Sequence, residues 1–332
     1  MREITYTEYS DEDLPSIVRF WNASFSTWPN AVRMTAHLYR TRVVELNTGV
    51  EAFEPKGFIL AWDGKKIVGY CHSGTRSGVV CRRLYDGWEG GSEGFIALIY
   101  VAKDYRNRGI GTELMRRAKQ YLYGTARIVI DGQVFNPFYG NSAGPATCFF
   151  GTTEGISVPD EDEAAKKFFS REGFEKRYTG VALEVALSSV SLKRVGATRN
   201  AAEDNGVMFR TKKNVSPTIG MPERISLQYD ASQTFDSFYA VRDGLTIGIV
   251  VSYPMKGLVS KEKKAAIYHL EVSKDARGIG LGEALLSSAL VDLKSRRQMK
   301  KCETLTLQEV SPEALKLYKK VGFKEMRRWA IY

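Results

Sequence analysis

The chain has little cysteine and histidine and no long apolar run. Of its 332 residues only 4 are cysteine and 3 are histidine, and they are scattered without the close spacing of zinc sites or disulfide frameworks. We therefore expect no metal site and no disulfides. No apolar stretch approaches the ~18–20 residues that cross a bilayer, and residues 1–6 lack the apolar core of a signal peptide. These absences predict a cytoplasmic protein without membrane contact.

What the chain does contain is typical of folded globular domains. Hydrophobic residues make up 43% and charged residues 26% of the sequence, close to the averages for soluble proteins. The length suits two domains of ordinary size. The net charge is +10, and residues 256–332 hold 17 Lys and Arg against 9 Asp and Glu. This excess suits an anionic ligand or an acidic partner but does not choose between them.

Two segments of the sequence repeat each other. Residues 99–111 (IYVAKDYRNRGIG) and 270–282 (LEVSKDARGIGLG) align without a gap. Each begins with an apolar run of strand type, passes through a glycine loop and continues into a stretch of helical periodicity. Residues 164–174 and 313–323 form a second pair, each read as a short helix that ends at a glycine. The sequence therefore predicts the same structural unit twice.

Other local signals surround these repeats. Asp63-Gly64 and Asp243-Gly244 each separate two apolar runs and predict β-hairpins. The first half is also expected to hold a strand over residues 4–9 and helices over 11–25 and 31–44. Residues 131–157 form a long insertion before the final helix of the first half, and its aromatic residues are candidates to cover a pocket or contact the other domain.

The glycine loops point to an anionic ligand. Closely spaced glycines between a strand and a helix let backbone N–H groups converge on an anion, and the helix N-terminus adds partial positive charge. Neither loop has the Lys-Ser/Thr ending of an ATP-binding P-loop. Phosphate is therefore the expected ligand of both loops.

With these motifs, both halves resemble the GNAT acyl-CoA transferase superfamily. The signature of that family, an arginine followed by spaced glycines and a later Gly-Phe helix end, is present in each half. The resemblance implies acetyl-CoA as cosubstrate, bound without a metal. It assigns cofactor binding in the first half to Val101, Arg106, Arg108, Gly109, Ile110, Gly111 and Thr112. In the second half it assigns the same role to Val272, Arg277, Gly278, Ile279, Gly280, Leu281 and Gly282.

The resemblance also implies a fold and a domain plan. We expect an α+β protein of two GNAT-like domains, each a splayed, mostly antiparallel sheet flanked by helices, with the second domain smaller. The cofactor would lie in the splay, beyond the strands that end at Val101 and Val272. The expected boundaries are residues 1–187 for the first domain, 188–204 for a linker and 205–332 for the second domain.

The two halves differ at the positions where chemistry is expected. The family places a tyrosine of the last helix beside the CoA sulfur, and this position is Tyr318 in the second half but Phe169 in the first. A phenyl ring cannot donate a proton. Glu271, a carboxylate within an apolar strand, is the candidate base, with Tyr100 at the matching position of the first half. Tyr318 and Glu271 are therefore the predicted catalytic residues.

We expect an N-acetyltransferase that passes acetyl from acetyl-CoA to a primary amine by direct attack, with the second domain catalytic. Two alternatives stay open: the first domain catalyses and the second is auxiliary, or the chain is a CoA-regulated binding module for protein or nucleic acid. Nucleic acid is the less favoured partner, because no RNA-binding motif accompanies the basic residues. The acceptor is expected to be a small-molecule or peptide amine without strong positive charge.

Overall fold

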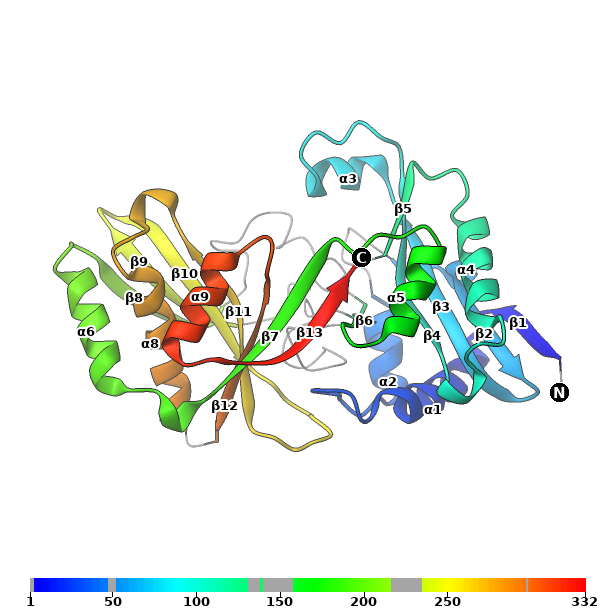
Figure 1. The fold of residues 1–332 in the computed structure, drawn as a ribbon, viewed down its shortest axis with the longest axis horizontal. Coiled ribbons are helices and arrows are strands. Elements are labelled where there is room, and N and C mark those ends of the chain that lie inside the picture. Colours follow the sequence, from blue (N-terminus) through cyan, green and yellow to red (C-terminus); the bar gives the residue numbers. More distant parts are fainter. Residues whose placement is uncertain (1–2, 47–51, 131–137, 140–157, 216–234, 297) are drawn as a thin grey trace.

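The chain forms two lobes, each built on one β-sheet (Figure 1). The computed structural model describes residues 3–46, 52–130, 138–139, 158–215, 235–296 and 298–332. In these ranges no helix has the length and apolarity that a bilayer crossing needs. Helices and mostly antiparallel strands occur in both lobes, which confirms the expected α+β class.

The first lobe contains a five-stranded sheet in the order β1-β2-β3-β4-β5. Alternate residues of its second strand serve the two faces: Phe58 and Leu60 pack with α1, whereas Ile59 and Ala61 pack with α4. The strands are β1 (Ile4–Glu8), β2 (Phe58–Asp63), β3 (Lys66–Arg76), β4 (Glu93–Val101) and β5 (Arg127–Ile130). The helices are α1 (Leu14–Phe25), α2 (Ala36–Tyr39), α3 (Gly78–Leu84), α4 (Ile110–Tyr121) and α5 (Glu163–Arg171).

The second lobe contains an eight-stranded sheet in the order β6-β13-β7-β12-β11-β10-β9-β8. Its helices share one core on one face of the sheet. The strands are β6 (Val158–Pro159), β7 (Tyr178–Ala186), β8 (Met208–Val215), β9 (Phe235–Arg242), β10 (Leu245–Pro254), β11 (Lys264–Val272), β12 (Lys301–Leu307) and β13 (Lys324–Ile331). The helices are α6 (Leu192–Glu203), α8 (Leu281–Ser295) and α9 (Pro312–Val321).

Both sheets open where two parallel strands separate. Strand β4 pairs with β5 only from Glu93 to Ile96, and from there to Val101 it is paired only with β3 on its other side. Strand β11 pairs with β12 only over Lys264–Ala266. The expected splay is therefore confirmed in both domains.

Local turn chemistry explains the hairpin of the second lobe. Strands β9 and β10 are joined by Asp243 and Gly244, which both have positive φ (52° and 79°), as the tight hairpin turn between twisted strands requires.

The helix expected over residues 31–44 begins only at Ala36. The preceding residues are held elsewhere, because Val32 forms a β-bridge with Leu258 of the second lobe.

Two strands of the expected first domain, β6 and β7, belong to the second sheet. Strand β7, which precedes the expected boundary at residue 187, lies between β12 and β13 of the second sheet. Strand β13 in turn pairs with β6, and its Ala330 together with Tyr332 joins the core of the first lobe. The segment 188–204 contains helix α6, which packs against α8. The domain boundaries remain predictions.

A buried ionic network also joins the lobes. Lys264 Nζ lies 2.9 Å from a Glu184 carboxylate oxygen, 2.8 Å from Glu262 and 3.3 Å from Glu303. Asn30 of the first lobe donates to Glu303 Oε1 at 2.7 Å and accepts from Lys264 at 3.2 Å. Burial opposes the charge on this lysine, but the carboxylates, Glu303 foremost, raise its pKa above the usual value.

A second buried polar group lies in the core of the first lobe. His72 of β3 is fully buried, and its Nδ1 lies 2.8 Å from the hydroxyl of Tyr139, which itself lies 3.1 Å from that of Tyr39. Phe138 packs edge-on to the imidazole at 4.5 Å. These two aromatics of the 131–157 insertion thus belong to the core, and the rest of that insertion lies outside the described residues.

We expect His72 to make stability depend on pH. Burial lowers its pKa from 6.5 to about 3. Between these two pH values His72 is therefore protonated in the unfolded chain but stays neutral in the folded chain. The free energy of unfolding should therefore fall as pH drops from 6.5 toward 3, with His72 accounting for about 2 kcal/mol between pH 7 and pH 5. Urea unfolding of His72→Gln should show a shallower pH dependence, with the exposed His37→Gln as matched control. An unchanged slope in His72→Gln would contradict this.

Candidate functional site

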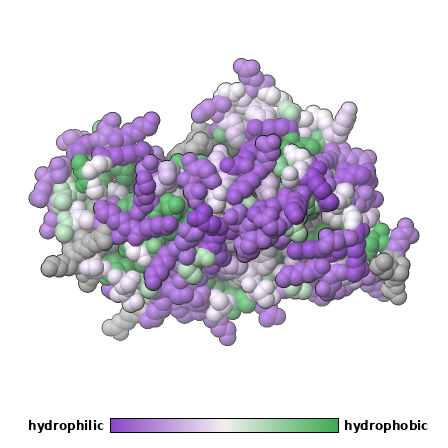
Figure 2. Space-filling view, in the orientation of Figure 1, coloured by the Kyte–Doolittle hydropathy of each residue, from purple (hydrophilic) through white to green (hydrophobic). Residues whose placement is uncertain are grey.

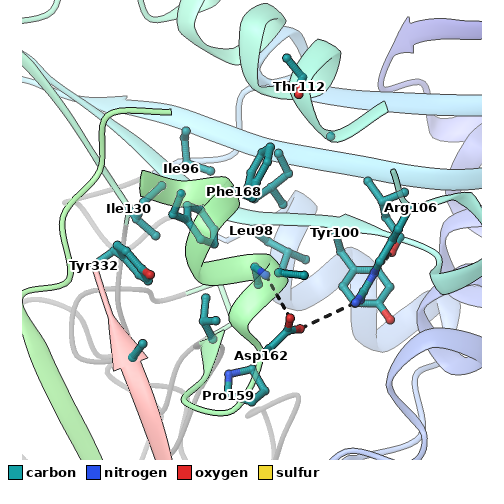
Figure 3. Close-up of a pocket in the computed structure, with 18 of the residues that line it drawn as sticks. Ile96, Leu98, Tyr100, Arg106, Thr112, Ile130, Pro159, Asp162, Phe168 and Tyr332 are labelled. Carbon is teal, nitrogen blue, oxygen red and sulfur yellow. Dashed lines mark hydrogen bonds and ion pairs between the residues drawn. The ribbon is translucent and has the colours of Figure 1, made fainter. Parts of the chain in front are cut away.

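A cavity of about 260 Å³ occupies the splay of the first lobe. Its walls come from β4, the glycine loop, the start of α4, one side of α5 and the last residues of β13 (Figure 3). The edge of β4 that faces this cavity is unpaired beyond Ile96. Such an edge presents backbone N–H and C=O groups that can bond to an amide-containing ligand.

The glycine loop forms the polar end of the cavity. Gly109 caps α4 in the left-handed conformation (φ 79°), which favours glycine. The first-turn N–H groups of the helix lack intrahelical partners and attract anions. Gly111 lines the cavity, and a Cβ added there would lie 3.4 Å from the Phe168 ring. The absence of a side chain at this position therefore leaves room for a ligand.

Arg106 connects this loop to the neighbouring elements. Its Nε donates to the carbonyl of Val101 at 3.1 Å, and its guanidinium lies 3.7 Å from Asp162, which also accepts from the backbone N–H of Ala165 at the start of α5. Arg106 and Arg171 give the lining two cationic side chains. The remaining predicted residues of this loop divide by position: Val101, Gly109, Gly111 and Thr112 line the cavity, Ile110 is buried, and Arg108 lies over the Tyr105 ring.

The loop of the second lobe has the same backbone but different surroundings. Arg277 Nε donates to the carbonyl of Val272 at 3.0 Å, and Gly280 caps α8 with φ 80°. At the position matching Thr112, however, stands Glu283, which is buried and lies 2.7 Å from Lys320 of α9. This second loop lines neither the cavity of the first lobe nor a second cavity of about 750 Å³ near Met255.

The two predicted catalytic residues face different surroundings. Tyr318 lies in the core beneath the helices, 4% exposed, and burial raises its pKa to about 12. Glu271 is half exposed and lies 3.2 Å from His269 Nε2. Leu270 and Val272 pack into the helix-side core, so strand alternation turns Glu271 to the opposite face of β11.

The matching positions of the first lobe both line the cavity. Phe169 stands where the second lobe has Tyr318, and Tyr100 stands where it has Glu271. The guanidinium of Arg106 lies 5.4 Å from the centre of the Tyr100 ring. Neither aromatic is a strong base, so this cavity depends on other groups for its acid and base chemistry.

Sequence reasoning missed the contribution of β13 to this cavity. Ala330, Ile331 and Tyr332 line it, although they follow the second repeat. Trp329 stacks on Trp28, another lining residue, with ring centroids 5.9 Å apart. The available signal was the apolar run 329–332 after two arginines, but that run does not reveal which lobe it joins.

The arrangement fits an extended anionic ligand with a less polar tail. The helix start and two arginines suit phosphate groups, and the apolar walls with an unpaired strand edge suit an aliphatic chain that carries amide groups. CoA has this constitution. In the part of the chain that the structure describes, no group of three His, Cys, Asp or Glu side chains is placed to hold a metal.

Comparison with known proteins agrees with this geometry. The model of the acetyltransferase (GNAT) family matches residues 17–137 and 209–323. The chain has no significant match among curated proteins.

Several solved structures have the same architecture. The GCN5-related glucosamine N-acetyltransferase region of a fungal multi-domain β-N-acetylglucosaminidase is 17% identical, with a TM-score of 0.66 over 99% of this chain and 38% of that one. A tandem GNAT protein from the clavulanic acid biosynthesis pathway is 15% identical, with a TM-score of 0.63 over 99% and 97% of the two chains. A GCN5-related N-acetyltransferase from Sphaerobacter thermophilus is 13% identical, with a TM-score of 0.55 over 98% and 94%. At such identities the likeness shows the fold alone.

Proposed function

Because the chain belongs to the acetyltransferase (GNAT) family, we propose that it transfers acetyl from acetyl-CoA to an amine in the cavity of the first lobe. The observation that carries the proposal is the meeting of an anion-binding glycine loop and a splayed strand edge in one cavity. This assignment takes the alternative in which the first domain catalyses.

The residues of this chain have clear roles in such a reaction. The first turn of α4, with Arg106 and Arg171, would hold the phosphates, and the free edge of β4 would bind the amide groups of the arm. The bound thioester supplies the activated acyl group. Phe169 and Ile130 give the far end of the cavity apolar walls, which would limit the water available to hydrolyse the thioester.

A second candidate places catalysis in the second lobe, as the catalytic-residue pattern predicts. Its support is the matching loop geometry and the His269–Glu271 pair. The burial of Tyr318 and the Glu283 carboxylate at the helix start oppose it, because a carboxylate repels phosphate where Thr112 of the first lobe would not.

The acceptor is proposed as an uncharged or anionic small-molecule or peptide amine. The basic excess of residues 256–332 disfavours a polycation. An amino sugar belongs in any panel of acceptors, since one structural relative is described as a glucosamine N-acetyltransferase region.

The test is an amine panel with acetyl-CoA. We expect free CoA thiol to be released in proportion to one or more of glucosamine, amino acids and a short peptide, with spermidine a poor substrate, and mass spectrometry should find the acetylated amine. If CoA binds but no amine accelerates thiol release, the CoA-regulated binding module is the better account. Release driven best by spermidine would contradict the acceptor class.

A further inference from the structure

Tyr332 brings a phenol to the wall of the cavity from the other half of the chain. Its side chain lines the cavity and is 9% exposed, and its ring packs on that of Phe169 with centroids 4.9 Å apart. Figure 3 places it on the side of Ile130, away from Arg106 and Tyr100. A hydroxyl group therefore stands next to the helix position where this lobe has only a phenyl ring.

Backbone pairing on both sides holds the strand end that precedes this residue. Ala330 pairs with Val158 of β6, and Ile331 pairs with Tyr178 of β7. The carbonyl of Ile331 also accepts from the backbone N–H of Arg177 at 2.7 Å. The phenol of Tyr332 is therefore carried by a fixed strand end, and fixed placement is what an interaction with a transition state requires.

Three other polar side chains of the cavity are engaged or lie at its opposite end. Arg106 and Asp162 bind each other and nearby backbone groups. Thr112 lies in the first turn of α4, at the phosphate end. The hydroxyl of Tyr332, by contrast, reaches the carbonyl of Lys166 at 3.5 Å, longer than a good hydrogen bond, so a nearer acceptor can take it.

The cavity has a direction that fixes which part of the cofactor meets this hydroxyl. If the glycine loop holds the phosphates, as proposed above, the thioester would lie toward the opposite end, where β4 and β5 separate at Ile96 and Ile130. Tyr332 stands on that side. The group of a bound acetyl-CoA that would lie nearest this hydroxyl is the thioester.

Resting on the proposed function, we propose that the Tyr332 hydroxyl donates a hydrogen bond to the sulfur as the thiolate leaves. The amine lone pair forms the C–N bond, the C–S bond breaks with its electron pair on sulfur, and the ammonium proton passes to water. The thiolate then takes a proton from solvent or leaves as the anion.

The protonation state of the phenol agrees with this role. Burial, the largest cause, raises the pKa of Tyr332 above its usual value, whereas a free thiol titrates near ~8.5. The phenol therefore keeps its proton and stabilises the thiolate as a donor rather than as an acid. The negative charge on sulfur exists only late in the reaction, so the bond lowers the barrier more than it strengthens binding.

Tyr332→Phe tests this with little change in shape. We expect kcat to fall by about 10- to 100-fold, the range for one hydrogen bond to a charged group, while KM and the affinity for acetyl-CoA stay nearly unchanged. Tyr178→Phe is the matched control, because this tyrosine sits opposite Ile331 on the neighbouring strand and outside the cavity lining. Adding Phe169→Tyr to Tyr332→Phe should restore part of the loss, since it returns a hydroxyl next to the same place.

The outcomes separate this inference from the proposed function. If the unmodified chain transfers acetyl to no amine, the proposed function fails and the inference fails with it. If the unmodified chain is active and Tyr332→Phe keeps its kcat, the inference alone is overturned. A parallel loss of kcat and acetyl-CoA affinity, without rescue by Phe169→Tyr, would assign Tyr332 a packing role and also overturn it.

Discussion

Gly111→Val is expected to abolish acetyl-CoA binding and turnover while the chain remains folded. A Cβ at this position meets the Phe168 ring at 3.4 Å, an ordinary contact, and the backbone there is not left-handed. The branched side chain instead fills the space over the first turn of α4 that the phosphates need. Each hydrogen bond to a charged phosphate that is lost corresponds to a roughly 10- to 100-fold weaker affinity.

Gly282→Val is the matched control for this experiment. It makes the same change at the repeated position, where a Cβ would lie 3.2 Å from Leu317, beside a loop whose helix start already holds the Glu283 carboxylate. Isothermal titration with acetyl-CoA should give one site per chain in the unmodified protein and in Gly282→Val, and none in Gly111→Val. Two sites in the unmodified protein, one removed by each variant, would restore the expectation that both loops bind CoA.

Lys264→Met should destabilise the whole chain by about 3–5 kcal/mol, the cost of removing one partner from a buried ion pair. The variant leaves three carboxylates around an apolar side chain, among them the fully buried Glu303. Arg327 and Asn30 still contact Glu303 at 3.2 and 2.7 Å, but they cannot replace the cation at the centre of the cluster.

The neighbouring lysine provides the comparison for this prediction. Lys301 contacts Glu184 and Glu262 but is 38% exposed, so Lys301→Met should cost less than about 1 kcal/mol. Urea unfolding measures both variants. The deficit of Lys264→Met should shrink as pH falls toward ~4, where carboxylates become neutral. Equal effects of the two substitutions would show that burial of the cluster does not govern its energy.

The sequence predicted the parts of the fold that depend on short-range chemistry. The Asp243-Gly244 turn requires residues that tolerate positive φ, and the loop before α4 requires Gly109 for the same reason. Both requirements leave a local signature of residue types. The repeat of residues 99–111 at 270–282 likewise predicted two sheets that open at corresponding places, and the structure confirms this.

The features that the sequence did not predict depend on pairing between distant residues. The contact of Glu283 with Lys320 joins two helices, and neither residue is unusual by itself. Tyr332 enters the cavity because β13 bridges both lobes, and the alternation of residues 324–331 is the same whichever sheet they join. Motif matching therefore located the cofactor loops, but it could not rank the two domains or find the phenol.

The placement of β6 and β7 in the second sheet sets an order for the assembly of the chain. Strand β7 lacks one of its two neighbours in the second sheet until β13 has been synthesised. The end of the chain also supplies part of the wall of the first cavity. A nascent chain that has reached residue 187 therefore carries a strand with no partner, exposed to wrong pairing until the ribosome finishes the second half. Although the two repeats resemble independent units, neither lobe can complete its structure before the whole chain has been synthesised.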